Sequence, residues 1–550
     1  MAIESKRWLY AIWAVVIGVF AVLHAMNLSA DFPNHTPWLS DWAKYTDEGW
    51  YGNAAIRAHL LGHWYVPGDF NPAPAVPVWP FLEWILFFFT GVTVEAARGL
   101  AVAFFLANLT LSYLLLRPRG PKWMAMLALT LMVTSPFLYC FSRLAILEPL
   151  LTTLLLLALN LAVRLPRMER PVAMSVVIGV LFTLMMLTKL TAVFLAPAIG
   201  WAIFAAFWDR GEASPDIGRL SPQRWLQRSA LRCSGAAALA FTLTFGGWMA
   251  LVIGLGYFGD FRYLLFVNNY VKPTEFYWPL LSFWWSFHGS IWVDHILIPL
   301  AGLLIVASLV AATVFGRRTN WGTELLIDPV FGACILAAGG YIVFMTYQNH
   351  PQPRYFTVVA VFCFLIVAMV TQALIAQHGA LRLLGWGTAA VMAIAVAGNG
   401  AQTVSFATHP EYTFVTAARR LTAYIDQHPN GNRLLVSISG DEITLITHLQ
   451  SLCDDFSMRT PAFPDLGTKL AVYKPGWWAT WNDIDRGTLE DIHTHYSLEQ
   501  VAEFRAFDDP ERNVLVLFKL HLLPGGQARV INGNNLQRVL PEDKILIPVE

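Results

Sequence analysis

The sequence predicts a polytopic α-helical membrane protein with a soluble α/β domain at its C-terminal end. Of the 550 residues, 56% are hydrophobic and only 13% are charged, and the mean hydropathy is +0.50. Soluble domains carry about twice that share of charged residues. The 37 basic residues balance the 37 acidic residues, so the net charge gives no reason to expect a nucleic-acid partner. The five cysteines show no CxxC spacing, which argues against a thiolate metal site.

Eleven apolar runs are expected to cross the roughly 30 Å hydrocarbon core of a bilayer. They are residues 8–26, 96–116, 123–141, 149–163, 172–187, 191–208, 234–255, 291–315, 329–345, 356–376 and 384–404. The first run follows Lys6 and Arg7 and is longer than the apolar core of a secretory signal peptide. We therefore interpret it as an uncleaved membrane anchor.

A twelfth apolar run, residues 77–92, decides the topology. If it does not cross, the basic clusters between the other runs all fall on the cytoplasmic side, as the positive-inside rule requires; if it crosses, they all fall outside. These clusters are Arg117, Arg119 and Lys122; Arg164, Arg167 and Arg170; Arg210, Arg219, Arg224, Arg228 and Arg232; Arg317 and Arg318; and Arg382. Its prolines and Glu83 also disfavour a lipid-exposed helix. We therefore expect an interfacial or re-entrant segment, and about eleven spans that begin in the cytoplasm.

This topology places several polar segments on one external face. They are residues 45–98, Arg143 with Glu148, Lys189, residues 256–288 and residues 349–355. We expect residues 1–408 to form the transmembrane domain, with the chemistry in its first external loop, residues 30–98. Residues 409–550 have the composition of a soluble domain and, after eleven crossings, are expected on the periplasmic side.

Periodicity and turn signals predict the elements of this external α/β domain. Helices are expected at residues 411–428, 441–450 and 489–496, strands at 433–439 and 469–473, and a hairpin from 501–507 and 513–520. We interpret Gly440-Asp441-Glu442 as the start of a helix, because acidic residues favour that position, and not as a site.

Two adjacent carboxylates, Asp47 and Glu48, begin the aromatic part of the first loop. Acids near a membrane interface can deprotonate a hydroxyl, hold a cation, or remain solvated loop charges. Cations available on the same face are Arg143, Lys189, Arg262, Lys272 and Arg354. Each could bind an anionic ligand or only anchor the chain at the interface, and Arg143 and Glu148 could simply pair. The histidines are scattered without the spacing of a metal site.

The order of these residues resembles a known family. The matching pieces are Tyr45-Thr46-Asp47-Glu48-Gly49-Trp50-Tyr51, Trp64, Pro67, Asn71-Pro72-Ala73-Pro74, Val78-Trp79, Gly91, Ala96-Ala97-Arg98, Arg143, Glu148, Leu187-Thr188-Lys189 and Arg354-Tyr355. This pattern is similar to the GT-C superfamily of integral-membrane glycosyltransferases, in particular family 39 with the lipid A aminoarabinose transferases and protein O-mannosyltransferases. In that family a lysine stands at the position of Asn71, and an Asp is usual at that of Glu148.

The resemblance implies an inverting glycosyltransferase of the bacterial cytoplasmic membrane. It would move a sugar from a polyprenyl-phosphate donor to a lipid, polysaccharide or protein acceptor at the outer face, with Asp47 as general base. Glu48 would orient that base or hold a divalent metal ion, and no other cofactor is implied. The expected substrate-binding residues are Tyr51, Arg143, Glu148, Lys189, Arg262, Lys272, His350, Arg354 and Tyr355.

Two other functions remain as alternatives. One is a transporter or flippase of a lipid-linked sugar, but the spans are nearly free of the midplane charges that transporters use. The other is a non-catalytic scaffold with a GT-C shell, which the absence of the lysine at Asn71 keeps open.

Overall fold

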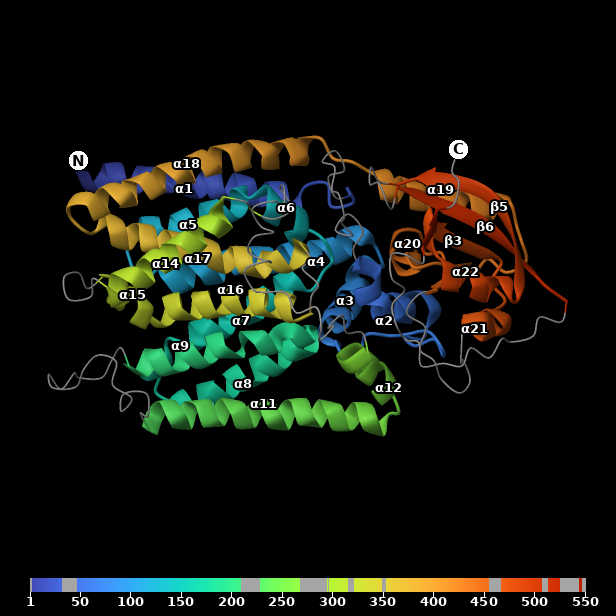
Figure 1. Ribbon diagram of the computed structural model, residues 1–550, viewed down its shortest axis with the longest axis horizontal. Coiled ribbons are helices and arrows are strands. Elements are labelled where there is room, and N and C mark those ends of the chain that lie inside the picture. The colour runs from blue at the N-terminus through green and yellow to red at the C-terminus, as the bar shows by residue number, and fades with distance from the viewer. Residues whose placement is uncertain are drawn as a thin grey trace.

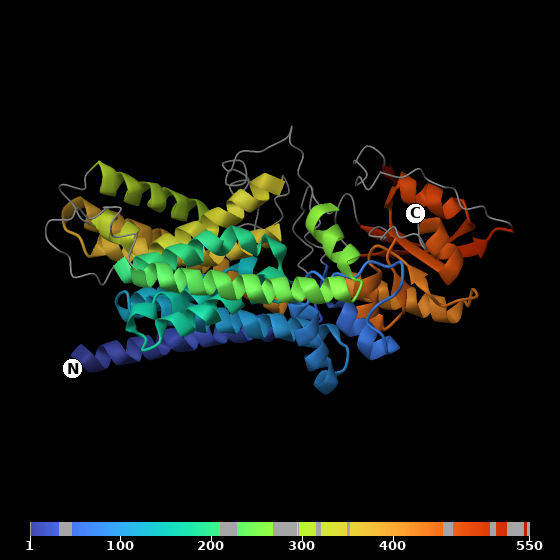
Figure 2. The same cartoon turned by 90° about the horizontal axis from the view of Figure 1, so that it is seen from below.

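The computed structural model describes residues 2–31, 47–208, 228–267, 294, 296–314, 321–348, 353–454, 466–506, 513–524 and 544–546. Figure 1 shows two parts, a bundle of long helices and a smaller mixed domain beyond one end of the bundle. The N-terminus lies at the opposite end of the bundle, and the C-terminus lies in the small domain. Figure 2 shows the same separation after a 90° turn. We call the small part the C-terminal domain.

Each predicted span corresponds to one helix or to a pair of broken helices. The bundle contains α1 (Ala2–Ala25), α4 (Val94–Leu116), α5 (Lys122–Thr134), α6 (Pro136–Ser142), α7 (Glu148–Ala162), α8 (Pro171–Thr188), η2 (Leu190–Leu195), α9 (Ala196–Trp208), α11 (Arg228–Gly254), α14 (Leu297–Thr313), α15 (Trp321–Ile327), α16 (Pro329–Gln348), α17 (Phe356–Ile375) and α18 (Gly379–Thr408). Within the described residues, seven helical segments are long and apolar enough to span a membrane, or eight with the bent pair α5–α6; α1, α7 and α14 are shorter apolar helices. The total of eleven crossings stays a prediction.

The break between α5 and α6 has a local cause. Ser135 ends α5, and its Oγ accepts a hydrogen bond from the backbone of Leu138, while Pro136 occupies the first position of α6. Proline cannot continue the preceding helix because it lacks an N–H donor. The two helices are bent by 68°, and the chain after α6 turns towards the junction with the C-terminal domain.

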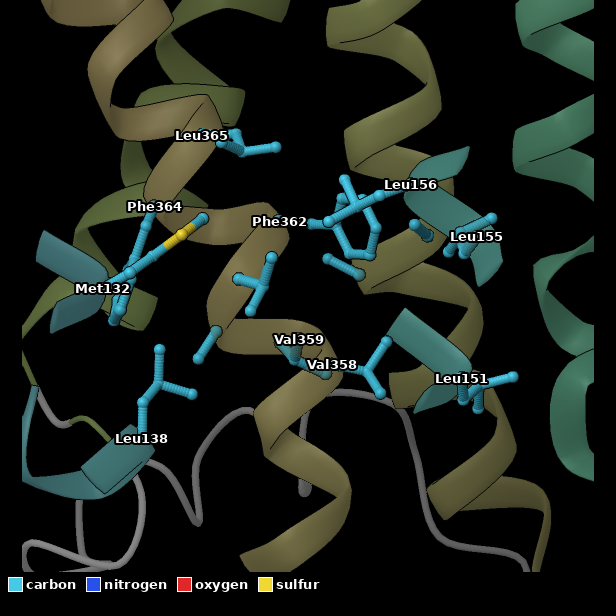
Figure 3. Close-up of a cluster of buried hydrophobic side chains, with 14 of the residues drawn as sticks. Met132, Leu138, Leu151, Leu155, Leu156, Val358, Val359, Phe362, Phe364 and Leu365 are labelled. Atoms are coloured by element: carbon cyan, nitrogen blue, oxygen red, sulfur yellow. The ribbon is translucent and has the colours of Figure 1, made fainter. Parts of the chain in front are cut away.

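Helix α17 lies at the centre of the bundle. In its most apolar stretch of 18 residues, 83% of the residues are buried. Figure 3 shows Met132, Leu138 and Leu151, from α5, α6 and α7, around Val358 and Phe362 of α17. Lipid is as apolar as these side chains, so close packing rather than exclusion of water holds such helices together. The central place of α17 therefore follows from its packing against neighbouring helices and not from its hydropathy, because the equally apolar α14 leaves Leu303 and Val306 exposed.

Helices α2 (Glu48–Leu61) and α3 (Val78–Thr90) lie at the junction between the bundle and the C-terminal domain (Figures 1 and 2). The 13 residues of α3 rise about 20 Å, less than the roughly 30 Å hydrocarbon core. Gly91, at φ 70°, ends α3, and Thr93 caps α4 by accepting a hydrogen bond from Ala96. This geometry agrees with a segment that does not cross on its own.

The C-terminal domain is built around a five-stranded sheet in the order β2-β1-β3-β6-β5. Its strands are β1 (Leu435–Val436), β2 (Ser451–Leu452), β3 (Trp477–Trp481), β5 (Tyr496–Arg505) and β6 (Val514–Leu522), and β4 (Asp483–Asp485) pairs with β7 (Lys544–Leu546). Strand β1 runs parallel to β2 and β3, whereas β6 is antiparallel to β3 and β5. The predicted hairpin is therefore confirmed.

Helices cover both faces of this sheet. They are α19 (Thr413–Gln427), α20 (Gly440–Thr447), α21 (Leu466–Tyr473) and α22 (Arg486–His493). Trp477 and Trp481 pack with α19, whereas Trp478 packs with α21 and α22 on the other face, because successive side chains of a strand point to opposite faces. The result is a three-layer α/β arrangement, and the helices predicted near 411–428, 441–450 and 489–496 are confirmed.

One predicted strand is wrong. Residues 469–473 belong to helix α21, in which Leu466, Lys469 and Leu470 are buried at the i, i+3 and i+4 spacing of a helix face. The central strand that was missed is β3, whose five residues are all buried. A strand covered on both faces shows no polar alternation, so its pattern is weak in the sequence.

Candidate functional site

Asp47 and Arg354 meet at the junction end of the bundle. Asp47 stands at the N-cap position of α2 but makes no side-chain capping hydrogen bond, and Arg354 lies in the short turn η4 (Pro353–Tyr355) that precedes α17. The Nη1 atom of Arg354 is 2.8 Å from Oδ2 of Asp47, and the two side chains are 12% and 33% exposed. The predicted base and a predicted phosphate-binding cation therefore form a partly accessible ion pair.

A second ion pair lies beside the first. Lys189 follows the last residue of α8, and its Nζ donates a hydrogen bond to Oε1 of Glu148, the first residue of α7. The same Nζ lies 4.1 Å from the centre of the Tyr355 ring, and Cζ of Arg354 lies 5.4 Å from that centre. Such distances allow cation–π attraction. Tyr355 therefore connects the two pairs.

Tyr51 completes the group that we call the Asp47 cluster: Asp47, Tyr51, Glu148, Lys189, Arg354 and Tyr355. The Tyr51 side chain is buried on α2, and burial raises the pKa of its hydroxyl, with Arg354, Asp47 and Glu148 as charged neighbours. All six residues were predicted as site residues. They come from four separate segments of the chain.

Glu48 has a different environment from its neighbour. Arg98 donates two hydrogen bonds to its carboxylate, from Nε at 2.8 Å and from Nη2 at 2.7 Å, and the backbone N–H of Ala145 donates a third at 2.7 Å. Arg98 also binds the backbone oxygens of Leu28 and Ala30. A bidentate pair of this kind is strong and directional, so Glu48 ties the first turn of α2 to the ends of α1 and α4.

A metal at Glu48 would have to displace Arg98. Within the part of the chain that the structure describes, no group of three or more His, Cys, Asp or Glu side chains could hold a metal ion. Arg98 and Ala145 occupy the Glu48 carboxylate, and the other predicted role of Glu48, which is to orient Asp47, stays a prediction.

The suggested pairing of Arg143 with Glu148 is wrong. Arg143 donates to the hydroxyl of Tyr139 and to the backbone oxygens of Met26 and Asn27 at the end of α1. Both carbonyls follow the last residue of α1, where backbone oxygens lack donors within the helix, and the Asn27 oxygen also accepts from the N–H of Ala30. Arg143 thereby caps α1, and Glu148 takes Lys189 instead.

The remaining predicted residues are not part of the Asp47 cluster. Arg262 is exposed at the end of α12 (Phe258–Arg262), and Lys272 and His350 lie outside the described residues. Asn71, at the position of the family's lysine, is buried and shapes the loop: its Nδ2 donates to the Trp64 carbonyl at 2.7 Å and its Oδ1 accepts from Ala73 at 2.9 Å. It supplies no charge to a ligand.

Buried charges join the C-terminal domain to this region, and no sequence pattern predicts that contact. Asp69 of the first loop lies between Arg57 of α2 and Lys469 of α21, whose Nζ is 2.5 Å from Oδ1 of Asp69. Arg57 also approaches Asp441 of α20 at 3.7 Å, and Asn53 donates to Asp441 at 3.0 Å. Burial acts to raise the pKa of Asp69, but Lys469 and Arg57 outweigh it and hold that pKa below its usual value.

Asp69→Asn is expected to loosen the C-terminal domain from the bundle. It leaves Lys469 as a buried cation without a carboxylate partner and Arg57 with only the longer pair to Asp441 at 3.7 Å, which costs about 3–5 kcal/mol. Thermal unfolding and limited proteolysis of the purified full-length protein would measure the loss. The control is Asp426→Asn, which removes a pair with Arg433 whose side chains are about half exposed and is expected to cost less than about 1 kcal/mol. Equal stability of the two variants would contradict the buried network as the joint.

An apolar groove lies beside α2. It has a volume of about 410 Å³ and is lined from α2, α3, α11 and the loops between them, including Ala54, Ala58, Pro77, Phe81, Trp84, Trp248, Leu251 and Leu255. Ala54 lies seven residues after Asp47, which corresponds to about 10 Å along a helix. The groove and the Asp47 cluster therefore share α2.

Comparisons with known proteins agree with this architecture. Residues 72–214 match the family model of dolichyl-phosphate-mannose-protein mannosyltransferases. No curated protein matches the chain by sequence. The family match and the fold together support a GT-C-type integral-membrane glycosyltransferase, the class that the sequence resembles.

Within that class, the chain is similar along nearly its whole length to ArnT from Cupriavidus metallidurans. The ArnT structure bound to undecaprenyl phosphate has a TM-score of 0.57 at 13% identity, and covers 92% of this chain and 98% of ArnT. The apo state gives 0.58 at 12% identity with the same coverage. The oligosaccharyltransferase AglB from Archaeoglobus fulgidus, in complex with an inhibitory peptide and a dolichol-phosphate, gives 0.49 at 15% identity over 87% of this chain and 70% of AglB.

Proposed function

We propose that the chain transfers a sugar from a polyprenyl-phosphate donor to a hydroxyl of a lipid, glycan or protein acceptor, with inversion at the anomeric carbon. The observation that carries this proposal is the ion pair of Asp47 and Arg354 beside Lys189. A base for a hydroxyl and two cations for a phosphate lie together, next to an apolar groove. The undecaprenyl phosphate bound in the ArnT structure supports this class of donor.

The proposed reaction is a single displacement. Asp47 takes the proton of the acceptor hydroxyl, whose oxygen attacks the anomeric carbon on the face opposite the phosphate. The bond between that carbon and the phosphate oxygen breaks, and polyprenyl phosphate leaves with the electron pair. Arg354 and Lys189 stabilise the developing charge, and the leaving phosphate needs no proton.

The resting ion pairs suggest how donor binding prepares the site. A donor phosphate competes with Asp47 for Arg354 and with Glu148 for Lys189, because each cation holds a carboxylate before the donor arrives. Binding then frees Asp47 to accept a proton. Glu48, held by Arg98, keeps the first turn of α2 in place during this exchange.

The location follows the topology that the sequence predicts. Asp47 and the C-terminal domain, residues 409–550, would lie at the periplasmic face of the bacterial cytoplasmic membrane, above a transmembrane domain of residues 1–408. The lipid tail of the donor would enter the bilayer through the apolar groove, whose walls Phe81 and Leu251 are strongly exposed.

The test of the function uses membranes that contain the full chain, supplied with polyprenyl-phosphate sugars extracted from the host and with an envelope extract as acceptor. Mass spectrometry follows the release of polyprenyl phosphate and identifies the sugar that is lost. Release that requires both substrates is expected. No release with any acceptor supplied would favour a transporter or a scaffold instead.

Ala58→Trp is expected to weaken the binding of long-chain donors about tenfold. The indole fills part of the groove, and each methylene of the tail that it displaces loses about 0.8 kcal/mol of binding free energy. The measurement compares the donor concentration for half-maximal release between a long polyprenyl donor and one with a tail of two isoprene units. The short donor is the control and should be unaffected; an equal loss for both would contradict the groove as the tail site.

A further inference from the structure

Helices α2 and α20 touch through their backbones at the junction of the bundle and the C-terminal domain (Figure 1). A Cβ atom added at Gly49, in the first turn of α2, would lie 2.2 Å from the carbonyl carbon of Asp441 and 2.5 Å from the backbone nitrogen of Glu442. Real Cβ atoms essentially never come within 3.0 Å of such atoms. Backbone atoms cannot turn aside as the end of a side chain can, so this contact requires glycine.

The same face of α2 continues the contact along the helix. Asn53 and Arg57 follow Gly49 at intervals of four residues, a spacing that places all three on one side of a helix. Nδ2 of Asn53 donates to Oδ2 of Asp441 at 3.0 Å, and Nη2 of Arg57 lies 3.7 Å from Oδ1 of the same carboxylate. Helix α20 is itself fixed in its domain, because Ile443 is fully buried in the core. The C-terminal domain therefore aligns α2 over about two turns.

The base moves with the first turn of α2. Asp47 stands two residues before Gly49, and its backbone carbonyl accepts a hydrogen bond from the N–H of Tyr51 at 2.9 Å. On its bundle side, the same turn is held by Arg98, which binds the carboxylate of Glu48. The turn that carries the base is therefore held between the bundle and α20. On the α20 side the contact consists of backbone atoms, so it sets the separation of the two helices.

We propose that Gly49 is a positioning residue, through which the C-terminal domain holds Asp47 opposite Arg354. Asp441 is its counterpart on α20. A Cβ atom at position 49 forces the two helices apart by at least 0.8 Å, the difference between 3.0 Å and 2.2 Å. Displacing a reacting group by about 1 Å can lower a rate about 100-fold. This inference rests on the proposed transferase function with Asp47 as base.

Gly49→Ala tests the role in membranes that contain the full chain. Host polyprenyl-phosphate sugars and envelope extract are supplied at saturating amounts, and the initial rate of polyprenyl phosphate release is measured. Binding of undecaprenyl phosphate to the same membranes gives the number and the affinity of folded sites. The rate per site is expected to fall about 10- to 100-fold. The affinity should be unchanged, because Arg354 and Lys189 lie on other segments. A merely structural role would lower the number of sites and leave the rate per site as in the parent.

The matched control is Gly235→Ala in α11. Gly235 is exposed, and a Cβ atom added there meets no atom within 4 Å. Both substitutions replace glycine by the better helix former inside a helix, so the difference between them isolates the contact with α20. The control should keep the rate per site and the affinity of the parent.

A double variant shows whether Gly49 acts through Asp47. In Asp47→Asn the base is already lost, so adding Gly49→Ala should change the remaining rate per site by less than about twofold. Effects of independent residues would multiply instead. The full loss caused by Gly49→Ala, repeated in the Asp47→Asn protein, would show that the glycine does not act through the base.

Asp441 tests the same contact from the other side without introducing a clash. Asp441→Ala removes the acceptor of Asn53 and a partner of Arg57, and should lower the rate per site about threefold to tenfold. Asp441→Asn keeps an acceptor for Asn53 and should stay within about twofold of the parent. These two variants decide the question if Gly49→Ala binds no undecaprenyl phosphate.

The outcomes distinguish the two proposals. No release by the parent overturns the transferase and this inference with it. With an active parent, the inference alone fails in any of three cases: Gly49→Ala keeps the parent's rate per site, its loss persists in the Asp47→Asn protein, or Asp441→Ala and Asp441→Asn behave alike.

Discussion

Asp47→Asn should lower the release of polyprenyl phosphate by about 10²- to 10⁴-fold, the contribution of a general base. The amide keeps the size of the side chain and can still accept the hydrogen bond of Arg354, but it cannot take the proton of the acceptor hydroxyl. The measurement is the initial rate of release from membranes with equal amounts of parent and variant. Binding of undecaprenyl phosphate should be retained, because the cations remain.

The control for this substitution is Asp426→Asn. Asp426 also pairs with an arginine, at 2.6 Å from Arg433, but on the exposed surface of the C-terminal domain. Its rate should equal that of the parent. Equal rates for Asp47→Asn and the parent would show that Asp47 is not the base. Glu48 would then be the next candidate, although its carboxylate is paired with Arg98.

Arg354→Gln should lower the rate by about 10²- to 10³-fold, the usual effect of removing one group that stabilises developing charge. Unlike Asp47→Asn, it should also weaken the binding of undecaprenyl phosphate, because a phosphate contact is lost. Rates and binding are measured on the same membranes. Arg433→Gln, which removes the exposed member of the matched pair, is the control and should leave both unchanged.

The double variant Asp47→Asn/Arg354→Gln sharpens this test. Residues that act in one network have effects that do not add, so the double variant should be less impaired than the product of the single effects. Strictly multiplicative losses would contradict an exchange in which the donor phosphate displaces Asp47 from Arg354. A variant Arg354→Gln that binds undecaprenyl phosphate normally would show that the ion pair only stabilises the fold.

Much of the site was predictable because its residues have local signals. Asp47 with Tyr51, Lys189 and Arg354 with Tyr355 stand in short motifs at the ends of apolar runs. The structure joins these motifs in one cluster. Their chemical roles stay proposals. The sequence did not predict which charges pair with each other. Arg143 was expected to pair with Glu148, but its guanidinium donates to the backbone oxygens of Met26 and Asn27 at the end of α1.

The contact between the C-terminal domain and α2 could not be predicted from the sequence, for a related reason. Gly440-Asp441-Glu442 does begin a helix, as the sequence predicts, and acids in a first turn are usually explained by the helix dipole. Their burial against α2 depends on Gly49, nearly four hundred residues earlier in the chain. No spacing within either segment indicates that contact.

The sequence by itself determined that this is a helical membrane protein with an α/β domain at its C-terminal end, where its apolar runs and the basic clusters between them lie, and which loop carries the acids. These properties are local, because hydropathy and loop charge act on each segment separately. Only the tertiary structure decided which charge faces which: Glu48 with Arg98, Glu148 with Lys189, and Asp69 with Lys469. A buried charge is tolerated only next to a partner, and that partner is set by how distant helices pack.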